Sequence, residues 1–274
     1  KPLLKKAIEL AKHKPEKCII YQRKDFKVDL EKNEIDWNDA VKEAKPVECI
    51  EMNANDYAYI LYTSGTTGPS KGVLLSHAAN LELSRHTSWL VGYKSDDVLY
   101  TAFPLYHINA KYTSVMCAME ANASLVMTQR FSASRFWDMC REKGITAFNY
   151  QGGLLMMLYK QPEKLDDRDN PVRRAFGAPC PVDIWEPFEE RFGLKLVEVY
   201  GSTEVAIAAE NPVSGRRIGT AGRESELYKV IIADEDDNSW IKAYVNWEIG
   251  LISFLGFRTS IGSLPDFPIA SVVI

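Results

Sequence analysis

The sequence predicts an α/β fold whose core is a largely parallel β-sheet. Between about residues 57 and 199, short runs of branched and aromatic residues alternate with helical patterns of roughly 10–15 residues, an alternation typical of parallel sheets with crossover helices. After about residue 225 the helical patterns stop, and two apolar runs flank the acidic stretch 234–238. We therefore expect an α/β core at residues 1–225 and a smaller β subdomain at residues 226–274.

The first elements follow from local patterns. Leu3, Leu4, Ala7 and Ile8 form one apolar stripe at helical spacing, which predicts an amphipathic helix and not a signal peptide. Ser76 has the place and chemistry of a helix N-cap. The expected elements are a helix at Pro2 to His13, a strand at Cys18 to Tyr21, a helix at Asp36 to Lys45, strands at Tyr57 to Tyr62 and Val73 to Leu75, and a helix from Ser76 to about Leu90.

In the second part, Gly144 and Gly193 each follow a helical pattern and are expected to end it. The expected strands are Val98 to Phe103, Ser124 to Met127, Ile145 to Asn149, Arg173 to Phe176, Leu194 to Val199, Tyr228 to Ala233 and Ile249 to Phe254. The expected helices are Ala110 to Glu120, Ser134 to Lys143, Leu154 to Lys160 and Val182 to Phe192.

Composition excludes several classes of protein. The 274 residues carry a formal net charge of -4 and are 46% hydrophobic, which is ordinary for a globular protein with a substantial core. Mild acidity gives no indication of nucleic-acid binding, and no apolar run approaches the roughly 18 residues of a membrane span. The five cysteines lie far apart without a Cys-x-x-Cys pair, which indicates a reducing, cytoplasmic setting. The four histidines show no metal-ligand spacing.

The segment from Thr63 to Gly72 has the composition of a loop that wraps a polyphosphate. Glycine lets the backbone approach an anion closely, and successive N–H groups then form an anion-binding concavity. Lys71 adds a mobile positive charge. The other residues expected to contact phosphate are Thr63, Ser64, Gly65, Thr66, Thr67 and Gly68.

This loop joins two predicted strands, and counting from Gly65 its spacing fails the Walker A pattern. A P-loop kinase or ATPase is therefore disfavoured. A serine hydrolase is disfavoured as well, because the sequence contains no Gly-x-Ser-x-Gly elbow.

A second polar motif, Tyr200 to Glu204, directly follows a predicted strand. Ligands of open α/β sheets bind beyond the carboxyl ends of the strands. A carboxylate at that place suits Mg²⁺, which takes one or two protein carboxylates together with substrate phosphates. By itself the motif is also explained as a glycine turn that starts a helix.

Together the two motifs resemble the signatures of the adenylate-forming superfamily, whose members include acyl-CoA synthetases, luciferases and the adenylation domains of peptide synthetases. That family usually has Pro directly before the Lys of its phosphate loop, whereas here Pro69 and Ser70 precede Lys71. The resemblance implies that Tyr200 packs on adenine, that Thr203 contacts the α-phosphate and that Glu204 binds Mg²⁺. It makes Lys71, Thr203 and Glu204 the catalytic residues. The other residues that it implies at the nucleotide are Gly177, Ala178, Pro179, Glu198, Val199, Gly201 and Ser202.

The acyl site is implied by a third segment. Phe103 to Asn109 resembles the family's aromatic and histidine motif, and we expect His107 to form a pocket wall or gate, because a carboxylate is already nucleophilic and needs no strong base. Asn149 and Gly152 are expected to line the acyl pocket. Arg130 to Trp137 is most similar to the carnitine/crotonobetaine-type acyl-CoA ligases.

The resemblance implies ATP-dependent activation of a small carboxylic acid to an acyl-adenylate and transfer to CoA, with ATP and Mg²⁺ as cofactors. The alternative is a degenerate remnant that binds nucleotide or a partner without turnover. The family's ribose-binding Asp is replaced by Ser260 in the nearest similar segment, and the mobile C-terminal domain with its catalytic Lys is not found. The sequence fits the family poorly from about Ser239. We therefore expect a chain truncated at both ends that binds ATP weakly and forms acyl-CoA very slowly or not at all. The acyl substrate and the oligomeric state stay open.

Overall fold

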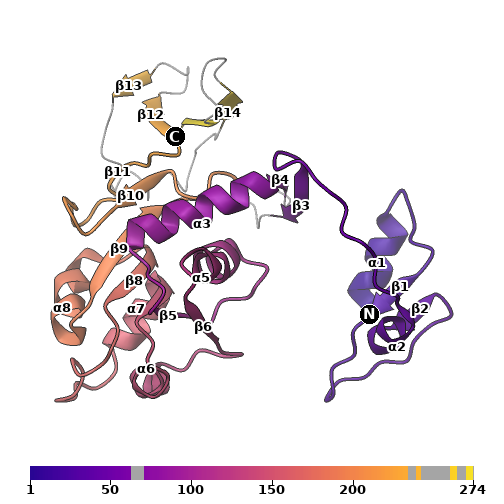
Figure 1. Ribbon diagram of the computed structural model, residues 1–274, viewed down its shortest axis with the longest axis horizontal. Coiled ribbons are helices and arrows are strands. Elements are labelled where there is room, and N and C mark those ends of the chain that lie inside the picture. Colours follow the sequence, from indigo (N-terminus) through magenta and orange to yellow (C-terminus); the bar gives the residue numbers. More distant parts are fainter. Residues whose placement is uncertain (63–70, 234–238, 242–259, 264–269, 274) are drawn as a thin grey trace. The chain divides into compact units, whose positions relative to one another are not determined.

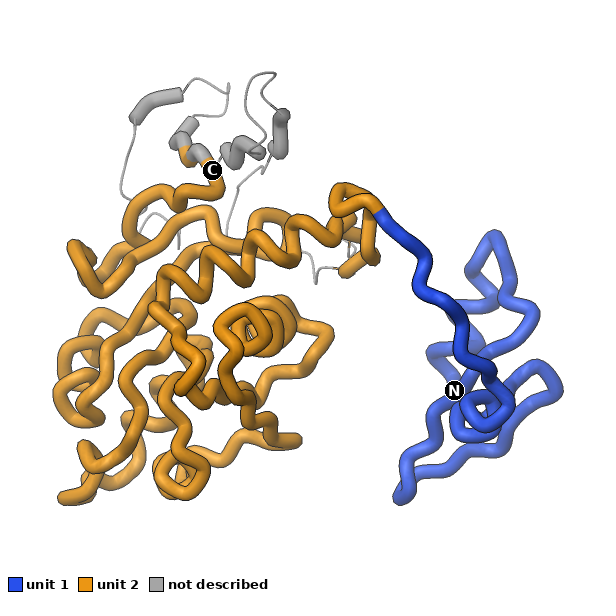
Figure 2. The backbone as a smooth tube through the Cα atoms, in the orientation of Figure 1, with its two compact units in different colours: residues 1–52 blue, residues 53–274 orange. Residues whose placement is uncertain are grey.

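The computed structural model describes residues 1–62, 71–233, 239–241, 260–263 and 270–273. The chain divides into two compact units, residues 1–52 and residues 53–274 (Figure 2). The predicted strand at 249–254 and the acidic turn at 234–238 lie outside the described residues. The predicted boundary at residue 225 differs from this division and stays a prediction.

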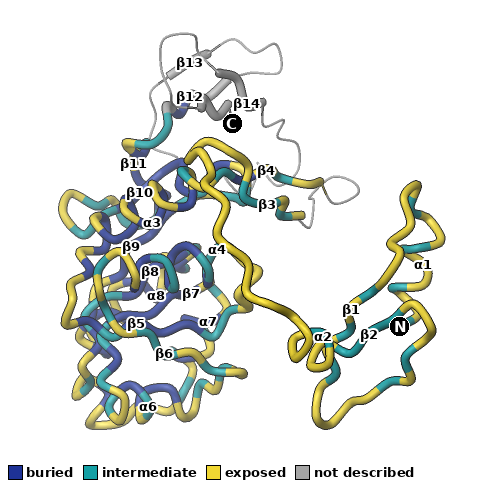
Figure 3. The backbone as a smooth tube through the Cα atoms, turned by 45° about the vertical axis from the view of Figure 1, so that its right-hand side comes forward, coloured by how far each residue is buried: buried dark blue, intermediate teal, exposed yellow. Residues whose placement is uncertain are grey.

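The first unit is small and open. Its strands pair in parallel, and the Asp36 carboxylate caps the second helix by accepting from the Asn38 N–H at 2.8 Å. None of residues 1–52, all of which are described, is buried (Figure 3). Its elements are α1 (Pro2–Leu10), β1 (Cys18–Ile20), β2 (Glu34–Asp36) and α2 (Trp37–Glu43).

The second unit is built on a seven-stranded sheet with the order β11-β10-β9-β8-β7-β5-β6 (Figure 1). The five strands from β9 to β6 in this order run parallel, while β10 is antiparallel to β9 and to β11. The predicted α/β class with a largely parallel sheet is therefore confirmed. The strands are β5 (Val98–Thr101), β6 (Ser124–Met127), β7 (Ala147–Gln151), β8 (Arg174–Ala178), β9 (Lys195–Tyr200), β10 (Ala209–Asn211) and β11 (Arg223–Glu224).

Helices cover both faces of this sheet. On one face, apolar side chains of α6, α7 and α8 pack in a core around Phe136, Leu155 and Trp185. On the other face, α3, the π-helix η1 and α5 pack around Leu83, Tyr112 and Cys117. The helices are α3 (His77–Val91), α4 (Ile108–Ala110), η1 (Lys111–Met116), α5 (Cys117–Glu120), the 3-10 turn η2 (Ala133–Arg135), α6 (Phe136–Lys143), α7 (Gly152–Tyr159) and α8 (Val182–Phe192).

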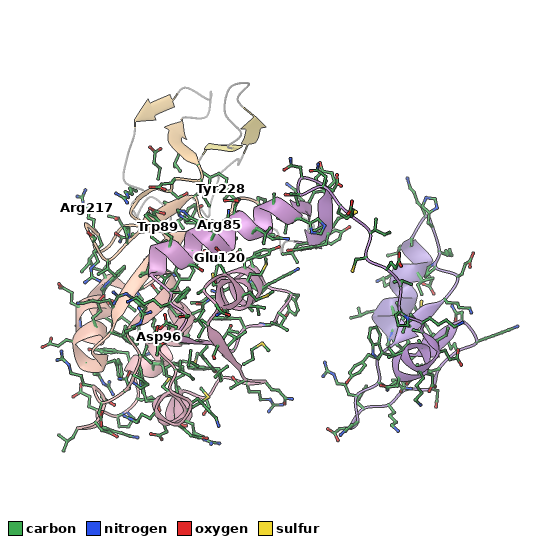
Figure 4. The ribbon with its side chains drawn as sticks, viewed as in Figure 1. Arg85, Trp89, Asp96, Glu120, Arg217 and Tyr228 are labelled. Atoms are coloured by element: carbon green, nitrogen blue, oxygen red, sulfur yellow. The ribbon has the colours of Figure 1, made fainter. Side chains whose placement is uncertain are left out.

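Smaller contacts hold these layers together. Figure 4 shows Arg85 of α3 beside Glu120 of α5, and the Arg85 Nε lies 3.6 Å from a carboxylate oxygen of Glu120. Ser76 caps α3 as predicted, because its hydroxyl oxygen accepts from the Ala79 N–H at 3.1 Å. Within the described ranges, every helix is too short or too polar to traverse a lipid bilayer.

Two further sheets complete the described chain. The strands β3 (Tyr57–Tyr62) and β4 (Gly72–Ser76) form an antiparallel pair, which confirms that the phosphate loop joins two strands. The other sheet has the order β13-β12-β15-β14, and its strands are β12 (Lys229–Ala233), β13 (Ser239–Ile241), β14 (Ser260–Ser263) and β15 (Ala270–Val273).

The structure corrects some predicted boundaries. The strand expected at Ile145 begins two residues later, because the N–H of Ile145 is used at the end of α6, where it donates to the Cys140 carbonyl at 2.9 Å. The helix expected from Ala110 to Glu120 is divided into α4, η1 and α5. The strands β10 and β11 were not predicted, and they extend the main sheet before the expected β subdomain begins.

Candidate nucleotide and acyl site

Several of the predicted site residues lie along one edge of the main sheet. Because β5 to β9 are parallel, their carboxyl ends share an edge, in the order β9, β8, β7, β5 and β6. The segments leaving this edge are those expected at the site: Tyr200–Glu204 after β9, Pro179 after β8, Gly152 after β7 and Phe103–Asn109 after β5. The topology thus places four segments that are far apart in the sequence at one edge.

Successive strand connections lead to opposite sides of the sheet from a point within this edge. From β5 the connection leads to β6 on one side, whereas from β7 it leads to β8 on the other side. Such a switch point, between β5 and β7, is where open α/β sheets bind ligands.

The loop after β9 is a tight turn that presents polar side chains. A Cβ on Gly201 would lie 1.5 Å from the Ala206 carbonyl oxygen, so only glycine fits there. The turn closes with the Ala206 N–H donating to the Ser202 carbonyl at 2.7 Å. Ser202 and Thr203 are half-buried and Glu204 is exposed, so their side chains are accessible at the edge.

Before this loop, the carboxylate of Glu198 in β9 is bonded to β7 and to the segment that follows β8. Glu198 in β9 is fully buried, and its Oε2 accepts from the Cys180 N–H at 3.0 Å and from the Tyr150 hydroxyl at 3.4 Å. Burial and the neighbouring carboxylate raise the pKa of Tyr150 well above its usual value, so this hydroxyl remains a donor. Val199 is buried in the adjoining core. The predicted contact of Glu198 and Val199 with adenine stays a prediction, whereas the support that Glu198 gives to neighbouring strands is a finding.

The ends of β7 and β8 touch each other through glycines. A Cβ on Gly152 would lie 2.7 Å from the Pro179 carbonyl oxygen, and one on Gly177 would lie 2.0 Å from the Tyr150 carbonyl oxygen. Ala178 is half-buried and Pro179 is exposed. The predicted base-contacting segment therefore adjoins the predicted acyl residue Gly152.

The phosphate loop is described only in part. Thr63, Ser64, Gly65, Thr66, Thr67 and Gly68 lie outside the described residues. Lys71 is exposed directly before β4. Leu61 and Val73 of the hairpin pack in the same core cluster as Val199 and as Ile207, which follows the β9 loop. The hairpin that carries the phosphate loop is thus anchored in the core cluster to which Val199 of β9 and Ile207 also belong.

At the end of β5, His107 starts the next helix. Its Nδ1 accepts from the Asn109 N–H at 3.1 Å, which leaves the proton of the neutral ring on Nε2. Although the residue as a whole is exposed, desolvation of its imidazole lowers the pKa of His107. The pocket-wall role expected for His107 stays a prediction, whereas its cap on the following helix is a finding.

Asn149, expected in the acyl pocket, is buried, and its side-chain nitrogen contacts several polar groups. Its side-chain nitrogen lies 2.9 Å from the Asn109 carbonyl oxygen, 2.6 Å from Thr113 Oγ1 and 2.8 Å from Ser114 Oγ. These partners belong to α4 and η1, the helical segment that follows β5. Asn149 therefore joins β7 to that segment across the switch point.

One cation near the site was missed from the sequence. The ammonium of Lys111, in η1, lies 3.6 Å from the centre of the Tyr59 ring, and desolvation lowers the pKa of this lysine. Tyr59 belongs to β3, which leads into the phosphate loop. The available signal was a lysine within the otherwise uncharged stretch 108–119.

A Mg²⁺ site at Glu204 would rest on one protein carboxylate. Among the described residues, no three His, Cys, Asp or Glu side chains are grouped so as to hold a metal ion. A single exposed carboxylate fits a Mg²⁺ ion that is carried mainly by the phosphates of a nucleotide.

Comparisons with known proteins agree with this geometry. Long-chain fatty acid transport protein 5 of Homo sapiens is 40% identical over 175 residues, which is 64% of this chain and 25% of that protein. The crotonobetaine/carnitine–CoA ligase of Salmonella paratyphi B is 32% identical over 189 residues, which is 68% of this chain and 37% of that ligase. The chain thus spans between about a quarter and two fifths of the length of these curated relatives.

Solved structures of similar fold are also found among CoA ligases and related proteins. ATP-bound MatB from Rhodopseudomonas palustris matches 74% of this chain and 41% of its own, with a TM-score of 0.65 and 26% identity. The anthranilate CoA ligase AuaEII in complex with anthranoyl-AMP matches 88% of this chain and 46% of its own with a TM-score of 0.72, and at 17% identity it supports the fold alone. The family model of the AMP-binding enzymes matches residues 1–252. The chain therefore belongs to the AMP-binding enzyme family.

Proposed function

We propose that this chain forms the nucleotide- and acid-binding core of an enzyme that activates a carboxylic acid with ATP and transfers the acyl group to CoA. The observation that carries the proposal is the shared edge, where the loop after β9 and the segments after β8, β7 and β5 leave the parallel sheet together. An ATP-bound relative and an acyl-CoA ligase among the similar proteins support it.

In the proposed reaction, a carboxylate oxygen attacks the α-phosphorus of ATP and pyrophosphate leaves. The CoA thiolate then attacks the acyl carbonyl and AMP leaves. Lys71 would balance charge on the departing phosphates, and Thr203 would donate to the α-phosphate. When bound at Glu204, Mg²⁺ would neutralise the negative charge that develops during the first step. The chain's contribution is mainly positioning and charge complementarity.

The proposal also concerns the cellular compartment and the class of carboxylic acid. The five cysteines are all free, which supports a reducing, cytoplasmic environment. The names of the relatives include long-chain fatty acids and crotonobetaine/carnitine, so they leave the class of acid open.

The first test is nucleotide binding. Lys71→Ala and Glu204→Ala should each weaken Mg-ATP binding about tenfold or more, the loss expected for a hydrogen bond or ion contact to a charged group. Lys94→Ala is the matched control, because Lys94 is an exposed lysine before the amino end of β5. Calorimetric titration with Mg-ATP measures the affinity of the unchanged chain, the two site variants and the control. Unchanged affinity in both site variants would contradict the proposal.

The second test is turnover. Pyrophosphate release is measured with ATP, Mg²⁺, CoA and a panel of carboxylic acids. We expect very slow release from the 274-residue chain, and turnover near the usual enzyme range of about 10 per second would contradict that expectation. ATP binding without release for any acid, in a longer protein that contains this chain, would favour the non-catalytic alternative.

A further inference from the structure

The turn that presents Ser202, Thr203 and Glu204 ends in a backbone conformation that residues with a side chain rarely adopt. Ala206 has a φ of 53°, which lies in the left-handed region where glycine alone is free of steric cost. The same residue closes the turn, because its N–H donates to the Ser202 carbonyl at 2.7 Å. Residues in such conformations persist only where the surrounding structure fixes the backbone. Contacts from outside the turn are therefore expected to hold Ala206.

Ser225, which directly follows β11, supplies such contacts. Its hydroxyl donates to the Ile207 carbonyl at 2.7 Å, and its N–H donates to the Ala208 carbonyl at 3.0 Å. The Ala208 N–H in turn donates to the Tyr200 carbonyl at 2.8 Å, so the first and last residues of the turn are bonded to each other. Ser225 and Ile207 are each 2% exposed. Little water is therefore available to replace the hydroxyl as the donor to the Ile207 carbonyl.

The chain that follows Ser225 packs against the turn as well. Val230 of β12 is buried in the same core cluster as Val205, the residue directly after the motif. Tyr200 and Tyr228 are half-buried and pack against this cluster, and Figure 4 labels Tyr228. The turn is thus attached to β9 at its start and to the segment that leads into β12 at its end.

From these contacts we propose that Ser225 is a positioning residue, which holds the turn and with it Thr203 and Glu204 in the orientation that binds Mg-ATP. Without the hydroxyl, the buried Ile207 carbonyl would lose this donor, and the backbone at Ala206 would relax out of the left-handed region. Relaxation there would alter the bond that closes the turn, so the accessible side chains would lose their fixed orientation. The inference rests on the proposed function, because it requires that Thr203 and Glu204 contact the nucleotide and its Mg²⁺.

The test is calorimetric titration of the folded chain with ATP, once with Mg²⁺ and once with EDTA. The ratio of the two affinities measures what Mg²⁺ adds to binding. In Ser225→Ala we expect this ratio to fall about five- to tenfold, the size expected when one buried hydrogen bond is lost. Lower stability by itself would not change the ratio in a folded protein. An unchanged ratio overturns the inference alone, whereas a lack of Mg-ATP binding by the unchanged chain overturns the proposed function and the inference with it.

Thr220→Val is the matched control. The Thr220 hydroxyl is also buried, donates to the Arg217 carbonyl at 2.9 Å and accepts from the Gly222 N–H at 3.1 Å, but none of these bonds reaches the turn. Thr220→Val and Ser225→Ala should each lower the melting temperature by about 3–6 °C. Only Ser225→Ala should lower the Mg²⁺-dependent ratio, and an equal fall in both variants would overturn the inference.

Two further variants test whether Ser225 acts through Ala206. Ala206→Gly permits the left-handed conformation without steric cost, so Ser225→Ala should lower the ratio less in that background than in the unchanged one. Losses that simply add would show that the two residues are not coupled, and would overturn the inference. Ser225→Cys keeps a weak S–H donor and should lower the ratio about two- to threefold. If Ser225→Ala does not fold, an unchanged ratio in Ser225→Cys overturns the inference.

Discussion

The two ends of the site edge are built in opposite ways. At the end of β9, the motif side chains Ser202, Thr203 and Glu204 are accessible, and the groups that support them, Glu198 and Gly201, are hidden or fitted against backbone. At the ends of β5 and β7, the predicted pocket residue Asn149 is itself buried and bonded to the neighbouring helix. The two ends thus differ in exposure: polar side chains are accessible at the end of β9, which we call the open end, whereas Asn149 is buried at the other, which we call the closed end.

The largest effect is expected at the open end, from Gly201→Ala. The added Cβ would lie 1.5 Å from a backbone oxygen, so the loop after β9 would have to shift, and we expect a loss of about 3–4 kcal/mol in the free energy of unfolding. The control comes from the closed end. A Cβ on Gly153 in α7 would meet nothing within 4 Å, so Gly153→Ala should stabilise by about 0.5–1 kcal/mol. Urea unfolding measures the free energy of unfolding of both variants. Similar values for Gly201→Ala and Gly153→Ala would refute the claim that only glycine fits at position 201.

A smaller effect is expected from the buried carboxylate that connects the two ends. Glu198→Ala removes the acceptor of the Cys180 N–H and of the Tyr150 hydroxyl, and should cost about 2–3 kcal/mol. Glu198→Gln keeps one acceptor oxygen, so it should cost less and retain more Mg-ATP affinity. Equal losses of stability and affinity in the two variants would mean that the charge of Glu198, and not its bond to Cys180, is what matters.

Much of the fold could be predicted because its signals are local. Ser76 begins a helix where expected, and Gly144 and Gly193 end helices where expected, with φ of 64° and 71° at the two glycines. The alternation of elements then predicted the parallel sheet. The open end of the site was predictable too, because a polar motif directly after a strand needs only the knowledge that parallel strands end together.

The closed end was less predictable, because its structure depends on contacts between distant residues. Asn149 is separated by 40 residues from Asn109, and its bond coincides with a π-turn that no local pattern indicates. In the same way, β10 and β11 are too short to show a period, and they form because they pair with β9 and with each other. The bonds of Glu198 likewise need Tyr150 of β7 and Cys180, which follows β8.

The smallest effect concerns His107, at the closed end, and depends on pH. Its folded-state pKa is lowered, so the stability that the neutral ring contributes is complete above the ordinary value of about 6.5 and is lost as pH falls through the lowered value. Protonation of Nδ1 would remove the bond that this atom accepts from the Asn109 N–H, a helix cap worth about 1 kcal/mol or less. His107→Asn keeps a capping oxygen without titrating, and His107→Ala removes the cap.

We therefore expect unfolding measurements between pH 5 and 7.5 to show a fall in stability on acidification that is smaller by a few tenths of a kcal/mol in His107→Asn than in the unchanged chain. At pH 7.5, His107→Ala should be the least stable of the three proteins, because only it lacks an acceptor for the Asn109 N–H. Subtracting the pH profile of His107→Asn from that of the unchanged chain removes the contribution of the other three histidines, which are His13, His77 and His86. Parallel pH profiles for the unchanged chain and His107→Asn would mean that the imidazole is as free to protonate as one in water. In that case the closed end would be more hydrated than the burial of Asn149 indicates, and the contrast with the β9 end would be weaker.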